Sequence, residues 1–473
     1  MSFYRRTAAQ SPRFRLILAS FLQKLGLAFA DVLPEEKVQQ AFDEEDVLFA
    51  QQEGDVYTPP VTLWAFLSQV LFKGEQRSCA AAVARVIVLL VGLGQPRCSD
   101  NTGSYCKARA KLSERVLGRL TYDVADGCEE AVPRGWLWHG RHVKLVDGTT
   151  VTMPDTAENQ QAYPQNPTQE KGLGFPIVRL VVLLSLATAM VGGLAIGPYA
   201  GKETGEPALL RELFDRLHSG DIVLADRFYC SYFMICLLQE LGVDVVSRLH
   251  QMRTADFRRG QRLAAGDHVV EWQRPVKPDW MDQATYERMP TSIRIREVEV
   301  AVAEPGFRVE KLVVVTTLTD AGRYTRQDLA ELYHQRWLVE LDIRAIKCTL
   351  GMDVLRCRTP EMVRKEIWAC LLAYNLIRQT MLESARQSGL SPRQLSFAAA
   401  LQKIAASWGA LPHFTPELAG SLIDIHLADL AEHEVGNRPN RVEPRAIKRR
   451  PKPHDLLKKP RAEARAELLA GKV

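Results

Sequence analysis

The sequence is poor in cysteine, and its few cysteines follow no metal-binding spacing. It contains 9 cysteines in 473 residues, and no two of them form a Cys-x-x-Cys pair. The odd number excludes complete pairing into disulfides within one chain, and the missing pair excludes the common structural zinc motifs. We therefore expect reduced, mostly buried thiols, as is usual in a cytosolic protein.

The sequence also lacks a clear membrane-spanning segment. A long uncharged apolar run, residues 180–197, is rich in β-branched residues and contains the pair Gly192-Gly193. This pattern favours two buried strands joined by a tight turn at the glycines over the alternative of a transmembrane helix. The N-terminus has two arginines but no apolar run that leads to a small-residue cleavage site. The sequence predicts a cytoplasmic protein without a membrane partner.

The positive charge of the chain is concentrated near its C-terminus. The formal net charge is +5, and residues 438–473 contain 12 Lys and Arg against 4 Asp and Glu. The other residues contain 49 Lys and Arg against 52 Asp and Glu. Such a basic tail fits either the neutralisation of nucleic-acid phosphates or a solvated disordered tail, and charge alone does not separate the two.

Hydrophobic patterning divides the chain into a helical part and a part built on a sheet. In the helical part, two short helices joined through residues 92–102 suit either a helix-turn-helix-like DNA reader or an ordinary helical bundle. The element order β-β-β-α-β-α-β then predicts an α/β fold with a ribonuclease H-like mixed sheet and helices on both faces. The predicted domains are residues 1–135 (helical), 136–249 (first part of the core), 250–322 (β-rich insertion), 323–400 (second part of the core) and 401–473 (helical segment and basic tail).

A helix predicted over residues 325–350 gathers polar side chains on one face. At 100° per residue, a stripe about 80° wide contains five of them: Tyr333, Arg336, Glu340, Arg344 and Lys347. Asp342 and Glu331 point to the opposite side, so the geometry selects Glu340 among the neighbouring acids. One carboxylate among cations suits a site where a metal and a phosphate meet. The alternative is a solvated face with i, i+4 ion pairs.

Two aspartates come at the ends of buried apolar runs. Asp147 follows Val-Lys-Leu-Val, and Asp226 follows Ile-Val-Leu-Ala. Taken singly, each is better explained as a turn or cap residue. Together with Glu340 they supply three carboxylates from two strands and a helix, at the rim of a sheet where active sites are built. Oxygen ligands favour Mg²⁺, with Mn²⁺ as a substitute, and two such ions about 4 Å apart would support phosphodiester chemistry.

These motifs together resemble a known family. The spacing Tyr333-x2-Arg336-x3-Glu340-x6-Lys347 is similar to the Y-R-E-K signature of bacterial DDE transposases in the insertion-sequence-four group. The segments VDGTTV and ADRFY around the two aspartates resemble the aspartate motifs of the same family. A β-rich insertion between the second aspartate and the glutamate is also typical of it, and the resemblance covers most of the chain.

The resemblance implies a role for each motif residue. Asp147, Asp226 and Glu340 would be the catalytic residues and would bind the metal. The DNA-binding residues near the transposon end would be Tyr333, Arg336, Arg344 and Lys347. An aromatic residue of the insertion would stack on a flipped base, and Trp272 and Trp280 are both candidates.

The function implied by the resemblance is DNA transposition in the bacterial cytoplasm, at the nucleoid. The enzyme would bind double-stranded DNA at the terminal inverted repeats of an insertion sequence and hydrolyse it at the ends of the element. The freed 3′-hydroxyl would then attack target DNA, in a cut-and-paste reaction that uses Mg²⁺. A homodimer in a synaptic complex is expected. Two alternatives are a ribonuclease H-like nuclease that cuts without joining and a catalytically silent DNA-binding regulator.

Overall fold

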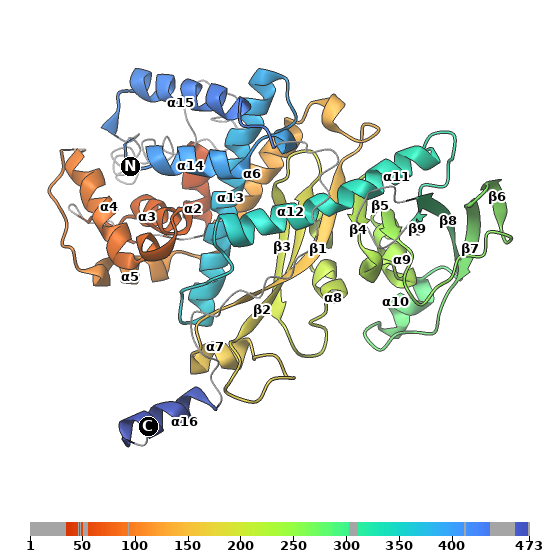
Figure 1. Cartoon of the computed structure of the whole chain (residues 1–473), viewed down its shortest axis with the longest axis horizontal. Coiled ribbons are helices and arrows are strands. Elements are labelled where there is room, and N and C mark those ends of the chain that lie inside the picture. The colour runs from red at the N-terminus through yellow and green to blue at the C-terminus, as the bar shows by residue number, and fades with distance from the viewer. Residues whose placement is uncertain are drawn as a thin grey trace.

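A sheet of nine described strands runs through the molecule, with a large group of helices beside one end and a smaller β-rich part at the other end (Figure 1). The structure, a computed structural model, describes residues 35–45, 47, 49–50, 55–92, 94–301, 311–410, 413–435 and 459–471. The predictions for the first 34 residues and for most of the basic tail, residues 436–458, lie outside the described residues.

The sheet has its strands in the order β3-β2-β1-β4-β5-β9-β8-β7-β6. The strands are β1 (Val143–Thr152), β2 (Ile177–Ser185), β3 (Val191–Pro198), β4 (Ile222–Ala225), β5 (Asp244–Arg248), β6 (Gln261–Ala264), β7 (Asp267–Gln273), β8 (Ser292–Ala301) and β9 (Lys311–Thr316). β1, β2 and β3 are antiparallel neighbours, whereas β4 and β5 run parallel to β1. Two helices, α8 (Glu206–Arg211) and α9 (Tyr232–Glu240), precede β4 and β5. The mixed α/β architecture is therefore confirmed.

The predicted turn between β2 and β3 was placed wrongly. The chain turns before β3, where Ala189 adopts a positive φ of 61°. Gly192 and Gly193 both lie inside β3, and the pairing with β2 slips by one residue next to Leu183, which is opposite Gly193. A Cβ at Gly193 would come within 2.9 Å of Leu183 Cδ1. The glycines therefore permit a bulge and a close cross-strand approach.

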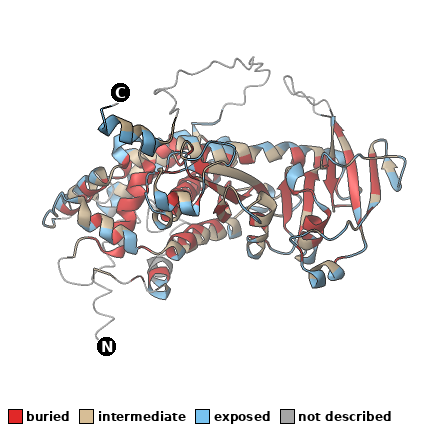
Figure 2. Ribbon diagram, turned by 90° about the horizontal axis from the view of Figure 1, so that it is seen from below, coloured by how far each residue is buried: buried red, intermediate tan, exposed pale blue. Residues whose placement is uncertain are grey.

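Successive side chains of the central strands point into two different cores. On one face, Leu145 and Leu224 pack in the core that contains most of α13 (Pro360–Ser388). On the other face, Val146 and Val223 pack with residues of α8 and α9. The middle strands are consequently buried on both sides, as Figure 2 shows. This explains why their sequences are nearly continuous apolar runs.

The β-rich insertion extends the central sheet and does not form a sheet of its own. β9 pairs antiparallel with β5, and β8, β7 and β6 follow outward. The helix α10 (Gln283–Arg288) lies in the connection between β7 and β8. Inside this part, buried Arg296 donates to both oxygens of buried Asp267, at 2.6 and 2.9 Å. The paired charges and their hydrogen bonds make this burial tolerable.

The N-terminal and C-terminal helices share one core around α13. They are α2 (Glu35–Glu44), α3 (Pro59–Leu71), α4 (Cys79–Gly92), α5 (Thr102–Lys111), α6 (Glu114–Glu130), α14 (Phe397–Ser407) and α15 (Pro416–Ala431). α13 contacts α3, α6, α14 and α15, while α3, α4 and α5 pack on one another. Two further helices, α7 (Ala157–Ala162) and α16 (Arg461–Leu469), lie together at the lower edge of Figure 1.

The structure can be compared with two predictions from the sequence, the lack of a membrane-spanning helix and the lack of disulfides. Within the described ranges, no helix is both long enough and apolar enough to cross a bilayer. All nine cysteines are free thiols, and five of them are buried. The prediction of unpaired cysteines is therefore confirmed.

A buried ion triad joins α12 (Leu338–Arg344) to the helical core. Asp342 is 1% exposed and accepts hydrogen bonds from Arg378 of α13 at 2.8 Å and from Arg393 at 2.9 Å. Arg393 also donates to the carbonyl oxygen of Ser185 at the end of β2, at 2.9 Å. The triad thus ties α12 to α13 and to the sheet.

We predict that Asp342→Asn destabilises the protein strongly. The amide would leave two arginine charges uncompensated in the interior, which costs about 3–5 kcal/mol. Thermal unfolding followed by circular dichroism should show a clear drop in Tm. The control is Glu331→Gln, an exposed position of α11 (Arg326–His334), which should unfold like the wild type. Equal Tm values for Asp342→Asn and the wild type would contradict the role of the triad.

Glu129, at the end of α6, lies against the beginning of β1. Burial by itself raises the pKa of its carboxyl, but a hydrogen bond with His142 at 2.7 Å and the charge of Lys144 at 3.0 Å lower the pKa to about 2. Because this is below the ordinary value of 4.5, the stabilisation is complete above pH 4.5. It is lost as the pH falls toward the folded-state pKa.

We therefore predict that Glu129→Gln lowers Tm at neutral pH and that its difference from the wild type shrinks below about pH 5. Tm values measured between about pH 7 and pH 3.5 check this. Glu130→Gln, the exposed neighbour, should show no such pH-dependent difference. A difference that grows in acid would show that the charged form of Glu129 does not stabilise the fold.

Candidate active site

The two aspartates of the sequence motifs lie side by side because two parallel strands hold them in register. In the pairing of β1 with β4, Leu145 is opposite Leu224. Continuing this register by two residues brings Asp147 level with Asp226, whose backbone is still extended. Since residues two apart share a face, both carboxylates lie on the side of the sheet that carries the two leucines.

Asp147 ends an apolar run of the sequence but lies inside its strand, whose observed bounds agree with a strand over residues 142–153. β1 continues to Thr152, because its second half pairs with β2 as far as Thr152 opposite Ile177. β4 ends at Ala225. Asp147 therefore lies beyond the last pair of β1 with β4, where the shorter neighbour leaves room beside it.

Asp226 begins the turn that follows β4. Its Oδ1 accepts a hydrogen bond from the backbone N–H of Phe228 at 2.7 Å and caps the 3₁₀ turn Arg227–Tyr229. Its carbonyl oxygen accepts from the hydroxyl of Ser247 at 2.7 Å. The cap role considered for this residue is therefore real, and it leaves the second carboxylate oxygen without a hydrogen bond from the described residues.

Asp147 lies in an acidic, partly buried environment. Burial, together with the charges of Glu206 and Asp226, raises the pKa of its carboxyl to about 6. A hydrogen bond from the N–H of Gly148, at 2.8 Å, and the charge of Arg336 act in the opposite direction. Negative charge in this place is therefore only partly balanced, which favours the binding of a cation.

The segment that carries Glu340 is a helix of changing pitch. Thr325 and Asp328 form a capping box at the start of α11, and the run continues through the 3₁₀ turn Gln335–Trp337, α12 and the π-helical turn Ala345–Thr349. The sequence prediction of uniform α-helical spacing is wrong at these two turns, which change the rotation per residue. Lys347 lies within the π turn, a feature that is frequent at functional sites.

Glu340 shares Arg336 with Asp147. α12 packs against β1, and the guanidinium of Arg336 donates to Glu340 Oε1 at 3.0 Å. Burial lowers the pKa of Arg336, but the nearby Tyr333, Glu340 and Asp147 raise it above its ordinary value. Asp342 instead faces α13, where it accepts a hydrogen bond from Arg378.

The remaining stripe residues differ in exposure. Tyr333 is 9% exposed, and burial raises the pKa of its hydroxyl to about 12. Lys347 donates to Thr149 Oγ1 at 3.1 Å and to the carbonyl oxygen of Thr150 at 2.7 Å, directly after the first aspartate motif. Arg344 is exposed. The structure thus brings the Y-R-E-K residues and the first aspartate motif together.

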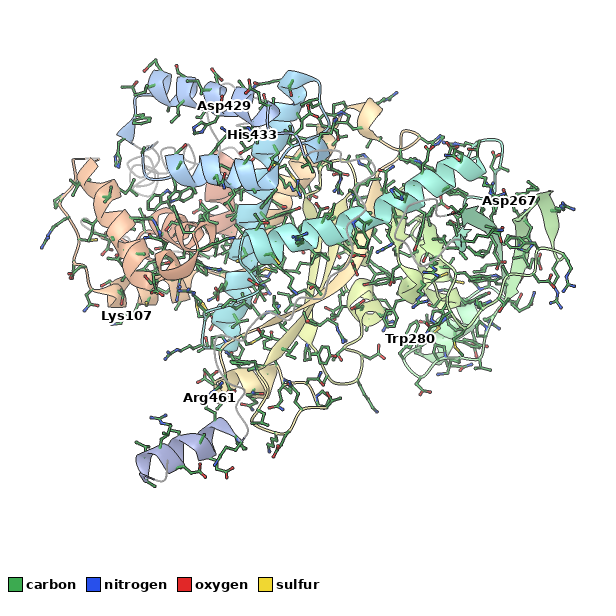
Figure 3. The ribbon with its side chains drawn as sticks, in the orientation of Figure 1. Lys107, Asp267, Trp280, Asp429, His433 and Arg461 are labelled. Carbon is green, nitrogen blue, oxygen red and sulfur yellow. The ribbon has the colours of Figure 1, made fainter. Side chains whose placement is uncertain are left out.

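The two tryptophans of the insertion have different environments. Trp272 is 5% exposed, and its indole N–H donates to Glu297 Oε1 at 2.9 Å. Trp280, labelled in Figure 3, is 36% exposed, with the guanidinium of Arg211 4.0 Å from its ring centre. Only Trp280 of this pair offers an exposed ring surface.

Glu206 is a further acidic residue of this region that the sequence analysis missed. It is the first residue of α8, and Tyr229 of the second aspartate motif donates its hydroxyl to Glu206 Oε2 at 3.2 Å. Burial raises the pKa of its carboxyl. The polar loop that precedes Glu206 contains no motif that indicates a functional acid. The one usable feature of the sequence was an acidic residue at the start of the helix after β3.

The donor chemistry fits a hard divalent cation, although the carboxylates are not arranged as ready ligands. Among the described residues, no group of three or more His, Cys, Asp or Glu side chains is placed to hold one metal ion. Glu340 is paired with Arg336. The side chains near Asp147 nevertheless offer carboxylate oxygens and excess negative charge, which suits Mg²⁺ or Mn²⁺ and not a thiol-bound metal.

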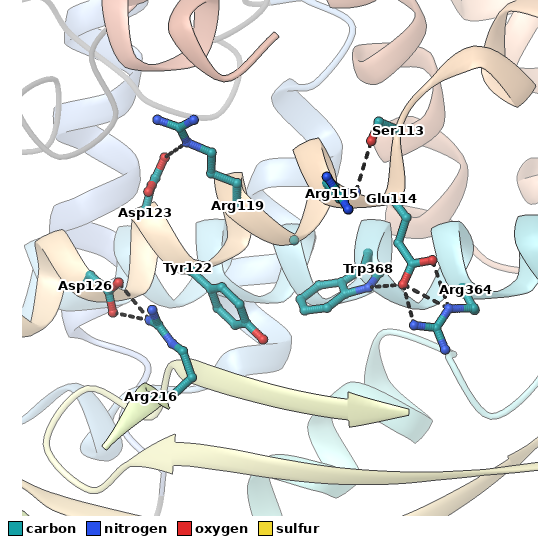
Figure 4. Close-up of a pocket in the computed structure, with 11 residues that line it drawn as sticks. Ser113, Glu114, Arg115, Arg119, Tyr122, Asp123, Asp126, Arg216, Arg364 and Trp368 are labelled. Carbon is teal, nitrogen blue, oxygen red and sulfur yellow. Dashed lines mark hydrogen bonds and ion pairs between the residues drawn. The ribbon is translucent and has the colours of Figure 1, made fainter. Parts of the chain in front are cut away.

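A cavity of about 730 Å³ lies elsewhere, between α6 and α13 (Figure 4). Three of its four arginines are ion-paired: Arg216 with Asp126, Arg364 with Glu114, and Arg119 with Asp123. The ring of Tyr122 lies 4.2 Å from the guanidinium of Arg216. The fourth arginine, Arg115, is exposed, and none of the motif residues lines the cavity, so it is not the candidate site.

Comparison with known proteins finds relatives of this chain. Residues 138–376, just over half of the chain, match the family model described as Transposase DDE domain. The chain is similar to "Transposase InsG for insertion sequence element IS4" of Escherichia coli (strain K12), with 27% identity over 353 residues that cover 73% of this chain and 76% of that protein. It is also similar to "Probable transposase for insertion sequence element IS5377" of Geobacillus stearothermophilus, with 24% identity over 64% of this chain and 73% of the relative.

Among solved structures, the chain was matched to the "Cryo-EM structure of piggyBac transposase synaptic complex with hairpin DNA (SNHP)". The TM-score is 0.43 and the sequence identity 11%, over 91% of this chain and 86% of that one. The residues of this chain that match the family model span Asp147, Asp226 and the helix of Glu340. The chain therefore belongs to the family of transposases with a DDE domain.

Proposed function

We propose that this transposase moves a bacterial insertion sequence by binding the terminal inverted repeats of the element and by cutting and joining DNA. The observation that carries the proposal is the register of β1 with β4, which sets Asp147 beside Asp226 under the helix of Glu340. The strand order around them supports a ribonuclease H-like core. In this proposal the partners are double-stranded DNA at the element ends and in the target, and a second copy of the chain in a synaptic complex.

In the proposed mechanism, Asp147, Asp226 and Glu340 would hold Mg²⁺, as two ions, with Mn²⁺ as a substitute. Such ions, when bound, activate an attacking oxygen and stabilise the leaving oxygen of a phosphodiester. Arg336 holds Glu340 in the structure and balances part of the acidic charge. A DNA phosphate that approaches the site would meet this guanidinium as a planar, bidentate donor.

The other stripe residues would orient the DNA. Lys347 and exposed Arg344 would contribute positive charge along the backbone, while buried Tyr333 supports Arg336 from the side. Trp280, with one exposed surface of its ring, is the better candidate for stacking on a flipped base. The proposal also includes cut-and-paste movement, in which water cuts first and the freed 3′-hydroxyl attacks the target.

We predict that Asp226→Asn and Glu340→Gln each abolish cleavage of DNA that carries the element ends. Each change removes a proposed metal-binding charge while preserving the shape of the side chain. Purified variants are incubated with the DNA and Mg²⁺, and products are separated on a denaturing gel. A loss of at least about 10²-fold in rate is expected.

The matched control is Glu331→Gln, which makes the same charge change at an exposed position on the same helical run. It should cleave at the wild-type rate, and all variants should still bind the DNA ends in a mobility-shift experiment. Cleavage by Asp226→Asn at an undiminished rate would show that the proposed active site is wrong.

A second prediction concerns Lys347. If its ammonium contacts a phosphate, Lys347→Ala should weaken binding to the element ends and reduce the slope of log K against log salt by about one. Fluorescence anisotropy at several salt concentrations measures this slope. Lys403→Ala removes the same charge from α14, where Lys403 pairs with Asp429 at 3.1 Å, and should leave the slope unchanged. A slope for Lys347→Ala equal to that of the wild type would exclude the phosphate contact.

A further inference from the structure

Two residues that follow the motif aspartates both lie against a single acidic side chain, that of Glu206. Gly148 comes directly after Asp147, and Tyr229 lies three residues after Asp226. Both contact Glu206, which reaches them from the start of α8. Two motifs far apart in the chain therefore meet at this carboxylate.

Gly148 provides the space in which the carboxylate lies. A Cβ at this position would overlap the Cδ and Oε1 atoms of Glu206. The backbone of Gly148 does not need a glycine for its conformation, because its φ is not among the positive values found in the chain. The glycine is consequently explained by close approach and not by a turn.

Tyr229 fixes the other oxygen of the same carboxylate. The tyrosine is 3% exposed, and its hydroxyl donates to Glu206 Oε2 at 3.2 Å. It belongs to the 3₁₀ turn that Asp226 caps. The position of Glu206 is therefore coupled to the turn that orients Asp226 and to the stretch of β1 that carries Asp147.

Among the described residues, Glu206 forms no ion pair. Its carboxylate accepts from the hydroxyl of Tyr229, and the charge of Arg179 lowers its pKa from a greater distance. A carboxylate that is half-buried and not ion-paired adds to the negative field around Asp147 and Asp226. A divalent cation held by the aspartates would benefit from that field.

We propose that Glu206 is a positioning residue of the active site, which aligns the two aspartates through Gly148 and Tyr229 and strengthens their hold on a divalent cation. This inference rests on the proposed function. It assigns a role to a residue outside the three motif carboxylates, and it accounts for two motif residues that the aspartates themselves do not explain.

The test is a calorimetric titration of the full-length protein with Mn²⁺ in the absence of DNA. Glu206→Gln keeps the shape of the side chain and an oxygen that accepts from Tyr229, but it removes the charge. We expect its affinity for Mn²⁺ to fall about fivefold or more. Glu212→Gln, an exposed position just after α8, is the matched control and should stay within about twofold of the wild type.

Three further variants test whether Glu206 acts through its charge and its position. Tyr229→Phe retains the charge of Glu206 but frees its carboxylate, so it should weaken Mn²⁺ binding less than Glu206→Gln. In the double variant the Tyr229→Phe change should add little, because Tyr229 acts by holding a charge that Glu206→Gln has already removed. Glu206→Asp, which restores the charge, should recover part of the affinity that Glu206→Gln loses. Circular dichroism establishes that each variant is folded.

The titration separates this inference from the proposed function when Asp226→Asn is measured alongside. If Asp226→Asn loses Mn²⁺ binding and both Glu206→Gln and Tyr229→Phe bind like the wild type, only the role of Glu206 is wrong. If Asp226→Asn also binds like the wild type, the proposed metal site and this inference fail together. Weakened binding by Glu206→Gln with unchanged binding by Glu212→Gln supports the proposal.

Discussion

The buried triad of Asp342, Arg378 and Arg393 sets the rotation of α12 about its axis, and the candidate site depends on that rotation. Two residues along an α-helix differ by about 200°. Burying Asp342 against α13 therefore turns Glu340 to the other side, where it meets Arg336. Burying a charged residue in the core to attach a helix costs free energy. The ion pairs allow only one orientation of the helix, whereas an apolar contact would fix the orientation less strictly.

The sheet supplies the complementary constraint. Asp147 and Asp226 are neighbours because β1 and β4 are parallel and in register, and a shift by one residue would move one carboxylate to the opposite face. Their relative position thus depends on backbone pairing between buried strands and not on a loop. The unequal lengths of the two strands matter as well, since β1 passes beyond β4 and leaves Asp147 accessible beside the turn of Asp226.

Much of this arrangement could be predicted from the sequence because it depends on local patterns. Apolar runs located the strands, and helical spacing separated Glu340 from Asp342. The errors arose where tertiary contacts decide. Gly192-Gly193 has the composition of a turn, but Leu183 on the facing strand makes it a bulge. The 3₁₀ and π turns around α12 leave no clear mark on hydrophobic spacing, and Glu206 acquires its surroundings only when α8 packs beside the aspartate motifs.

The balance of charge connects the fold to the proposed chemistry. Asp147, Asp226 and Glu206 act on one another through a partly buried region, and Arg336 offsets only part of their charge while also holding Glu340. A DNA phosphate brings another negative charge, so it would be repelled by the carboxylates unless cations lie between them. The same acids that raise the pKa of Asp147 therefore make divalent cations the natural link between this site and a DNA backbone. The site therefore needs its excess of acids because its substrate reaches it through bound cations. A neutral site of the same shape would bind phosphates through arginine and lysine alone.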